Sequence, residues 1–268
     1  MDMNNKHKAV LGIAALILIF MGLAIWYMAT HQAPSAIAPM ATSTPMTTGP
    51  QALVDTDLYY EIRGEYPGST PLAQSAGAEA DTAAVARMKS YMESVAAEFK
   101  KNGNFENLTN EDISLQGLDQ GRKYVLQAEY ETYQGLRTVS YVYTLYEDTL
   151  GAHPNAYYRT FTFDLSTGAE LTLGDLFTDS AYLQTLSARA RTDIPAIVRA
   201  KSGTDPDLEY LASGTMPEAA NFQNWYIDGA SLVLVFPPYQ IGPYALGTIL
   251  DPIPLSALTE KLKAAYRP

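Results

Sequence analysis

Two alternating runs between residues 139 and 177 constrain the fold of this chain more than any other feature. In residues 139–145 the odd-numbered positions are large and apolar, and in residues 160–163 threonine alternates with phenylalanine. A period of two is the signature of a strand with one buried face. The segment Gly151 to Asn155 separates the runs, and Ser166-Thr167-Gly168 offers a tight turn after them. The stretch therefore predicts neighbouring antiparallel strands joined by a short loop.

The remaining patterns extend this arrangement into an α+β fold, an antiparallel sheet with helices packed on it. Alternation and flanking turn residues predict further strands at residues 58–63, 124–131, 170–173, 225–227 and 231–236. Apolar residues spaced three and four apart predict helices at residues 79–103, 183–195, 205–211 and 256–266. Strands that are grouped, with helices set among them, favour α+β over a regular βαβ repeat.

Turn and cap residues set the predicted boundaries. Gln134-Gly135 and Asp228-Gly229 are each placed to close a hairpin, and Asp-Gly favours the turn type that matches strand twist. Gly103 is positioned to provide the left-handed cap of the first helix. Pro195 should kink or end the second helix, and Asp205-Pro206 should begin the third.

Composition narrows the classes of function. The chain has 268 residues, of which 47% are apolar, enough for one domain of about 200 residues with a proper core. The absence of cysteine excludes disulfides, thiolate metal sites and a cysteine nucleophile. The net charge of −11 argues against a nucleic-acid partner. The nineteen tyrosines could form a binding face, although most lie in alternating runs, where tyrosine simply suits strands.

The N-terminal region predicts a membrane anchor. Residues 9–29 are apolar and uncharged, long enough to cross a bilayer as a helix. Lysines precede this run and Trp26-Tyr27 closes it, which predicts a cytoplasmic tail at residues 1–8 and a single-pass protein of the cell membrane whose C-terminal domain is extracytoplasmic. A cleaved signal peptide is the alternative, although its apolar core is usually shorter. Residues 30–55, rich in Ala, Pro, Ser and Thr, predict a flexible linker.

Several phrases in the second half occur in the order of a known family. They are Gly151-Ala152-His153, residues 162–168, residues 171–177, Asn221-Phe222, residues 238–247 and Ile253-Pro254-Leu255. Together they resemble the RsiV-like extracellular domain family, whose usual forms are GGAH, FDLxTGKxLxLxDLF, YEIAPYAxG and IPY. The resemblance covers residues 139–268. Residues 56–138 resemble the companion domain that often precedes it, as in PdaC-type proteins.

The resemblance implies an α+β extracytoplasmic module without enzymatic activity. In RsiV the module belongs to a membrane-bound anti-sigma factor and binds lysozyme, and in PdaC-type proteins it accompanies a separate peptidoglycan deacetylase domain. This chain departs from both patterns. Its predicted tail of residues 1–8 is too short to hold a sigma factor, so no sigma-factor partner is expected, and no deacetylase domain is expected after Pro268. Only a binding role in the envelope is expected to carry over.

Four residues of the family-like loops are candidate ligand contacts: His153, Asn155, Tyr239 and Tyr244. A histidine can act as a general base near neutral pH, but the sequence lacks the GxSxG and HExxH motifs. The alternative for His153 is a structural role, with one ring nitrogen held by a backbone carbonyl. The proline-rich loop of residues 237–244 either presents an aromatic surface to a partner or closes a sheet edge. No catalytic residue, metal ligand or cofactor is predicted.

Three hypotheses for function remain. The first is a non-catalytic envelope module that binds a macromolecule, with a basic lysozyme-like protein as the candidate partner. Two basic and two acidic residues precede Thr56, which leaves 16 basic and 27 acidic residues of the chain's 18 and 29, and this imbalance would attract a basic protein. The second is a peptidoglycan-fragment binder. The third is an uncharacterised cell-wall hydrolase, which would need two acids or a Ser-His pair converging in a cleft.

Overall fold

The structure, a computed structural model, describes residues 49–268. The predicted tail, the predicted membrane anchor and residues 30–48 of the predicted linker lie outside the described residues. Across residues 49–268, no helix combines the length and the apolar character needed to cross a membrane.

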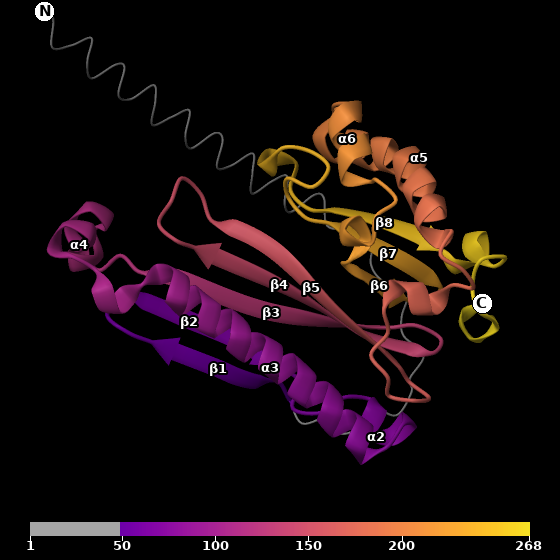
Figure 1. The fold of residues 1–268 in the computed structure, drawn as a ribbon, viewed down its shortest axis with the longest axis horizontal. Helices are drawn as coiled ribbons and strands as arrows, with labels where there is room; N and C mark the ends of the chain where they lie inside the picture. The colour runs from indigo at the N-terminus through magenta and orange to yellow at the C-terminus, as the bar shows by residue number, and fades with distance from the viewer. Residues whose placement is uncertain (1–48) are drawn as a thin grey trace, which may run out of the picture. The chain divides into compact units, whose positions relative to one another are not determined.

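Residues 49–268 contain a five-stranded and a three-stranded sheet, with helices on both (Figure 1). The strands of the larger sheet, in spatial order, are β1 (Gln51–Thr56), β2 (Tyr60–Tyr66), β3 (Tyr124–Gln134), β4 (Thr138–Asp148) and β5 (Asn155–Asp164). The strands of the smaller sheet are β6 (Trp225–Asp228), β7 (Ser231–Phe236) and β8 (Ile249–Pro254). The helices are α2 (Leu72–Ser75), α3 (Ala78–Gly103), α4 (Asn110–Gln116), α5 (Tyr182–Ser202) and α6 (Leu208–Gly214).

The α+β class is confirmed, but the larger sheet is mixed rather than antiparallel. Strands β2 and β3 pair in parallel, while the other neighbours in this sheet pair antiparallel. A parallel pair needs a long crossover, and α3 and α4 provide it. The two predicted hairpins, β3–β4 and β6–β7, are confirmed.

Strand β1 corrects the predicted linker, because Gln51–Thr56 pairs with β2 along its whole length. Its side chains are exposed or half-buried, so no buried alternating face marks it as a strand in the sequence. It is a strand because it pairs with β2 at the edge of the sheet.

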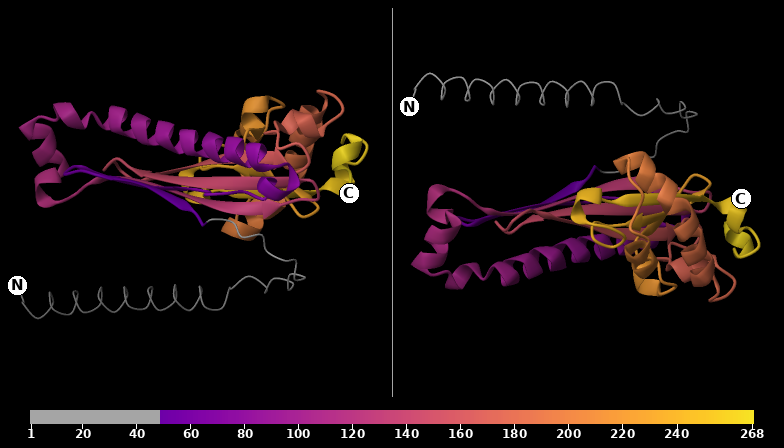
Figure 2. Two further views of the ribbon diagram at one scale, coloured as in Figure 1. Left: turned by 90° about the horizontal axis from the view of Figure 1, so that it is seen from below. Right: turned by 90° about the horizontal axis from the view of Figure 1, so that it is seen from above.

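Helix α3 lies along one face of the larger sheet, as both views of Figure 2 show. Its apolar stripe is buried as predicted: Met88, Met92 and Phe99 are at most 4% exposed. The stripe packs on the odd-numbered side chains of β4, including Tyr141 and Tyr143. The predicted glycine cap is wrong by one position, because Asn104, with φ of 47°, takes the left-handed conformation.

The opposite face of β4 packs against the smaller sheet. Val142 lies in a buried cluster with residues of β6 and β7. The edge strand β6 also donates backbone hydrogen bonds to side chains of the larger sheet: Ile227 N–H to Ser140 Oγ at 3.3 Å and Trp225 N–H to Thr160 Oγ1 at 3.2 Å. These bonds explain why hydroxyl side chains are buried at this junction, since a buried N–H needs an acceptor.

Helix α5 covers the smaller sheet and builds the largest apolar cluster of the described residues. Pro195 lies inside α5 without ending it. Proline removes one helical hydrogen bond, but Ile194 and Val198 on either side are at most 2% exposed, so packing holds the helix together.

Three other predicted elements differ from the structure. Residues 170–173 form only a single bridge, Glu170 to Phe163, rather than a strand. Asp207 rather than Asp205 caps α6, accepting bonds from the Glu209 and Tyr210 N–H groups. The predicted C-terminal helix is two 3₁₀ turns, Leu255–Leu258 and Ala264–Tyr266, separated where Leu262 bridges to Phe177.

Candidate functional site

Two loops that are distant in sequence bring three of the four predicted site residues together. His153 lies between β4 and β5, and Tyr239 and Tyr244 lie between β7 and β8. The His153 ring stacks on the Tyr244 ring, with centroids 4.1 Å apart and planes at 21°. His153 Nε2 lies 3.0 Å from Tyr239 Oη. We call His153, Tyr239 and Tyr244 the aromatic cluster.

Asn155 is not part of the aromatic cluster. It is the first residue of β5, where it pairs with Glu147 of β4. Its side chain is exposed, and it makes no hydrogen bond to the cluster among residues 49–268.

Hydrogen bonds fix the orientation of the cluster. His153 Nδ1 lies 2.9 Å from the Pro154 carbonyl oxygen, and the Tyr244 hydroxyl donates to the same oxygen at 2.8 Å. A carbonyl can only accept, so Nδ1 carries the hydrogen, and in the neutral ring Nε2 accepts from the Tyr239 hydroxyl. The backbone carbonyl therefore holds one ring nitrogen and Tyr239 holds the other.

The β7–β8 loop is tied to α6. Gln240 Nε2 donates to the Gly214 and Asn221 carbonyls at 3.0 and 2.8 Å. Gly214 allows this approach, because a Cβ there would lie 1.8 Å from the Gln240 carbonyl oxygen. The loop backbone thus lies directly on the end of the helix.

Tyr239 adopts an uncommon backbone conformation in this loop. Its φ is +70°, and the Gln240 N–H donates to the Pro237 carbonyl at 3.1 Å across the turn. A type II turn requires a positive φ at its second central residue and favours proline at the first, which here is Pro238. Large side chains rarely accept this conformation, and such outliers concentrate at functional sites. The turn holds the Tyr239 side chain 51% exposed.

The hydrogen-bond partners of His153 define the chemistry of the cluster. The hydrogen bonds of His153 within the described residues go to Pro154 and Tyr239, not to a serine hydroxyl or a carboxylate. Among residues 49–268, no group of three or more histidine, aspartate or glutamate side chains could hold a metal ion. The cluster presents aromatic side chains and the phenolic hydroxyl of Tyr239, whose side chain is exposed.

Comparison with known proteins finds a family model that matches a segment containing part of this site. Residues 174–256 match the family described as Protein of unknown function (DUF3298). Below, the name DUF3298 domain refers only to this matched segment, residues 174–256. A solved structure of a DUF3298 family member from Bacteroides fragilis NCTC 9343 has a TM-score of 0.53 at 18% identity, covering 82% of this chain and 94% of that one, and so shares the fold.

Two curated relatives extend the similarity beyond the DUF3298 domain. The chain is 31% identical over 131 residues to the peptidoglycan-N-acetylmuramic acid deacetylase PdaC of Bacillus subtilis strain 168. This match covers 48% of this chain and 27% of the deacetylase. It is 29% identical over 128 residues to the esterase Rv3036c of Mycobacterium tuberculosis H37Rv, covering 45% of this chain and 51% of the esterase. The matches thus span about a quarter and about half of these relatives. The narrower resemblance to RsiV stays a prediction.

The aromatic cluster lies at the boundary of the DUF3298 domain. Tyr239 and Tyr244 fall within the matched residues, while His153 comes from the β4–β5 hairpin before them. A second hydrogen bond joins the DUF3298 domain to the preceding strands: Thr248 Oγ1 donates to Tyr158 Oη of β5 at 3.0 Å.

Sequence reasoning missed two cavities. One, of about 560 Å³, lies between α5, α6 and the β7–β8 loop of the DUF3298 domain, and its lining includes Pro206, Ile241 and Leu246. The other, of about 600 Å³, lies at the end of α3, outside the DUF3298 domain. The family-like phrase of residues 238–247 contributes to the first cavity, but neither cavity could be predicted, because each is assembled from segments that meet only in the fold.

Proposed function

We propose that this chain is a membrane-anchored, extracytoplasmic binding module of the bacterial cell envelope, with a basic, lysozyme-like protein as its partner. The observation that carries the proposal is the aromatic cluster, an exposed surface built from two loops and fixed by hydrogen bonds on both ring nitrogens of His153. Tyrosine contributes large contact area at low entropic cost, as binding hot spots do.

Charge supports a basic partner. The chain has 29 acidic and 18 basic residues, a net charge of −11. A negative field steers a positively charged protein toward the surface and suppresses acidic competitors. The predicted apolar helix at residues 9–29 would hold the module at the membrane, with its binding surface outside.

Binding without catalysis is the second part of the proposal. Both relatives are named as enzymes, a deacetylase and an esterase, but the aromatic cluster provides no activated nucleophile. A hydrolase would need a serine or carboxylate within hydrogen-bond reach of His153, and Tyr239 occupies that position at 3.0 Å from Nε2.

The test is a titration of the purified full-length chain with a C-type lysozyme at low and high salt. We expect saturable binding that persists at high salt, because a packed aromatic contact is not screened as surface charges are. Tyr239→Gly should weaken binding at least about tenfold, the loss typical of an interface hot spot. Glycine preserves the positive φ of the turn, so the turn survives while the ring is lost.

The matched control is Leu115→Ala, which removes an exposed apolar side chain of α4, 78% exposed. It should leave the affinity for lysozyme unchanged. Binding that disappears at high salt, or that Tyr239→Gly does not weaken, would overturn the proposed partner.

A second candidate function, binding of peptidoglycan fragments, is favoured by the similarity to a protein named as a peptidoglycan-N-acetylmuramic acid deacetylase. The same titration with soluble peptidoglycan fragments in place of lysozyme separates the two candidates at the aromatic cluster.

A further inference from the structure

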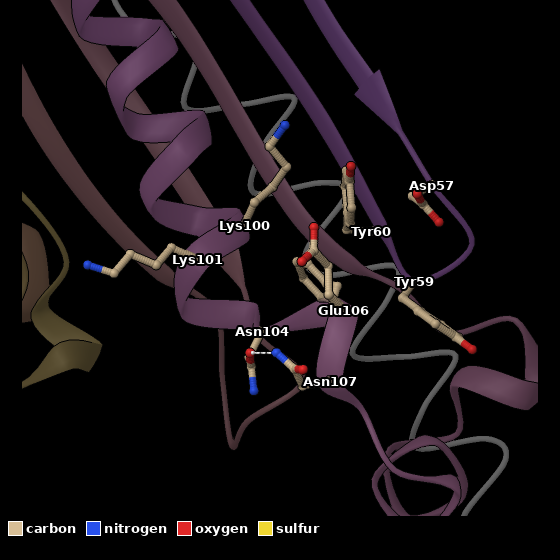
Figure 3. A pocket seen from close by; sticks show the side chains of 9 residues that line it. Asp57, Tyr59, Tyr60, Lys100, Lys101, Asn104, Glu106 and Asn107 are labelled. Carbon is tan, nitrogen blue, oxygen red and sulfur yellow. Dashed lines mark hydrogen bonds between the residues drawn. The ribbon is translucent and has the colours of Figure 1, made fainter.

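The cavity at the end of α3 is open and is lined by both polar and aromatic residues. It has a volume of about 600 Å³, within the range of small-molecule sites. It lies where the β1–β2 turn meets the chain that follows α3, and Figure 3 shows its lining side chains. It belongs to neither the aromatic cluster nor the DUF3298 domain.

An asparagine pair gives this cavity its specific chemistry. Asn107 Nδ2 donates a hydrogen bond to Asn104 Oδ1 at 2.8 Å, the dashed line of Figure 3. The bond leaves Asn104 Nδ2 as a donor and Asn107 Oδ1 as an acceptor without protein partners among residues 49–268. One free donor beside one free acceptor complements the C=O and N–H of a secondary amide.

The charges around the pair favour a neutral ligand. Lys100 forms an ion pair with Asp55, with Nζ 2.7 Å from Oδ2. Lys101 points away from the other labelled side chains in Figure 3. The carboxylates of Asp57 and Glu106 line the cavity and make no ion pair within the described part of the chain. They would repel a phosphate or carboxylate and accept hydrogen bonds from hydroxyl groups.

Aromatic surface completes the lining. Tyr59 and Phe105 both border the cavity and are half-buried. Phe105 is held in place by edge-on contact with Tyr124, with centroids 5.1 Å apart. Aromatic faces of this kind pack against the apolar C–H face of a pyranose ring while carboxylates bind its hydroxyls.

We propose that this cavity binds an N-acetylated amino sugar of a saccharide chain, with Asn104 and Asn107 recognising the acetamido group. Asp57 and Glu106 accept hydrogen bonds from the sugar hydroxyls, and the aromatic side chains pack on the ring. The site is separate from the aromatic cluster, so it does not depend on the proposed protein partner.

The test is calorimetric titration of the full-length chain with N,N′,N″-triacetylchitotriose, called chitotriose below. Cellotriose is the matched sugar that lacks acetamido groups. We expect saturable binding of chitotriose, and at least about tenfold weaker binding of cellotriose, because cellotriose has a hydroxyl in place of each acetamido group and loses the hydrogen bonds to the asparagine pair. Absence of saturable chitotriose binding, or equal binding of the two sugars, would overturn the proposal.

Two variants locate the binding. Asn104→Gly removes the amide and keeps the left-handed backbone, and Asn107→Ala removes the other half of the pair. Each should weaken chitotriose binding about fivefold to tenfold, the loss of one or two hydrogen bonds. Gln127→Ala, which removes an exposed amide of β3, should have no effect.

Thermal unfolding followed by circular dichroism checks that each variant is folded. A folded Asn104→Gly or Asn107→Ala variant that binds chitotriose as the parent does would also overturn the proposal. Loss of lysozyme binding in Tyr239→Gly tests the aromatic cluster separately, so the two proposals can fail independently.

Discussion

At the scale of single residues, Asp251 of β8 is the most unusual group in the DUF3298 domain. Its side chain is 1% exposed, and neither carboxyl oxygen has a hydrogen-bond partner among the described residues. The pKa of Asp251 is raised to about 6, chiefly by burial and also by the nearby Asp193 carboxylate, while Arg189 opposes the shift. The ionised form is therefore unfavourable in the folded protein.

This residue predicts a pH-dependent change in stability. Well below pH 3.8, the ordinary pKa of an aspartate, Asp251 is protonated in both the folded and the unfolded states, so its ionisation does not affect stability. Between pH 3.8 and about 6 only the unfolded state ionises, so stability falls as pH rises, by about 3 kcal/mol in total.

Asp251→Asn removes that ionisation. Its free energy of unfolding relative to the parent should therefore rise by up to about 3 kcal/mol between pH 4 and pH 7. Urea denaturation at several pH values measures the difference. Any cost of burying the asparagine amide is independent of pH, so a difference that stays constant from pH 4 to pH 7 would show that the carboxyl is not the source.

At the scale of elements, contact between α6 and the β7–β8 loop positions the aromatic cluster. Gly214→Ala should push the loop away, because the new Cβ would lie 1.8 Å from the Gln240 carbonyl oxygen. We expect a loss of about 1–3 kcal/mol in stability from overpacking, together with weaker lysozyme binding. Ser213→Ala, at an exposed neighbouring position of the same helix, is the control and should change neither. Unaltered binding by Gly214→Ala would mean that the helix does not position the loop.

The elements that the sequence predicts correctly are those specified locally. Helix α3 follows from its apolar spacing, and the β6–β7 hairpin follows from Asp228-Gly229. Helix α4 was missed although Thr109 and Asp112 form a capping box, a signal that the sequence contained. Strand β8 was missed because Pro252 and Pro254 discourage a strand, yet β8 pairs only with β7 and so tolerates them.

Features that depend on distant segments could not be predicted in the same way. The parallel pairing of β2 with β3 is set by the crossover through α3. Family resemblance selected His153 and Tyr239, but their contact joins residues 86 positions apart, and no local pattern encodes it. Sequence reasoning did not find the asparagine pair, Asn104 and Asn107, because only the folded chain shows that the two residues line a cavity.

At the scale of the whole molecule, the two sheets of residues 49–268 are joined by buried hydrogen bonds from β6 to the larger sheet. Ser140 is fully buried. Its Oγ accepts from Ile227 N–H at 3.3 Å and lies 2.9 Å from Thr162 Oγ1. Because each sheet satisfies buried groups of the other, we expect both to unfold in one cooperative transition.

Ser140→Ala tests this coupling. It leaves the Ile227 N–H buried without an acceptor, which should cost about 1–3 kcal/mol and lower the midpoint of the single transition without splitting it. Scanning calorimetry measures this, with the calorimetric enthalpy matching the van't Hoff enthalpy if unfolding is cooperative. Thr144→Ser, at an exposed position of the same face of β4, should have little effect. Two resolved transitions in the parent would instead mean that the sheets fold independently and that the junction carrying the aromatic cluster can open by itself.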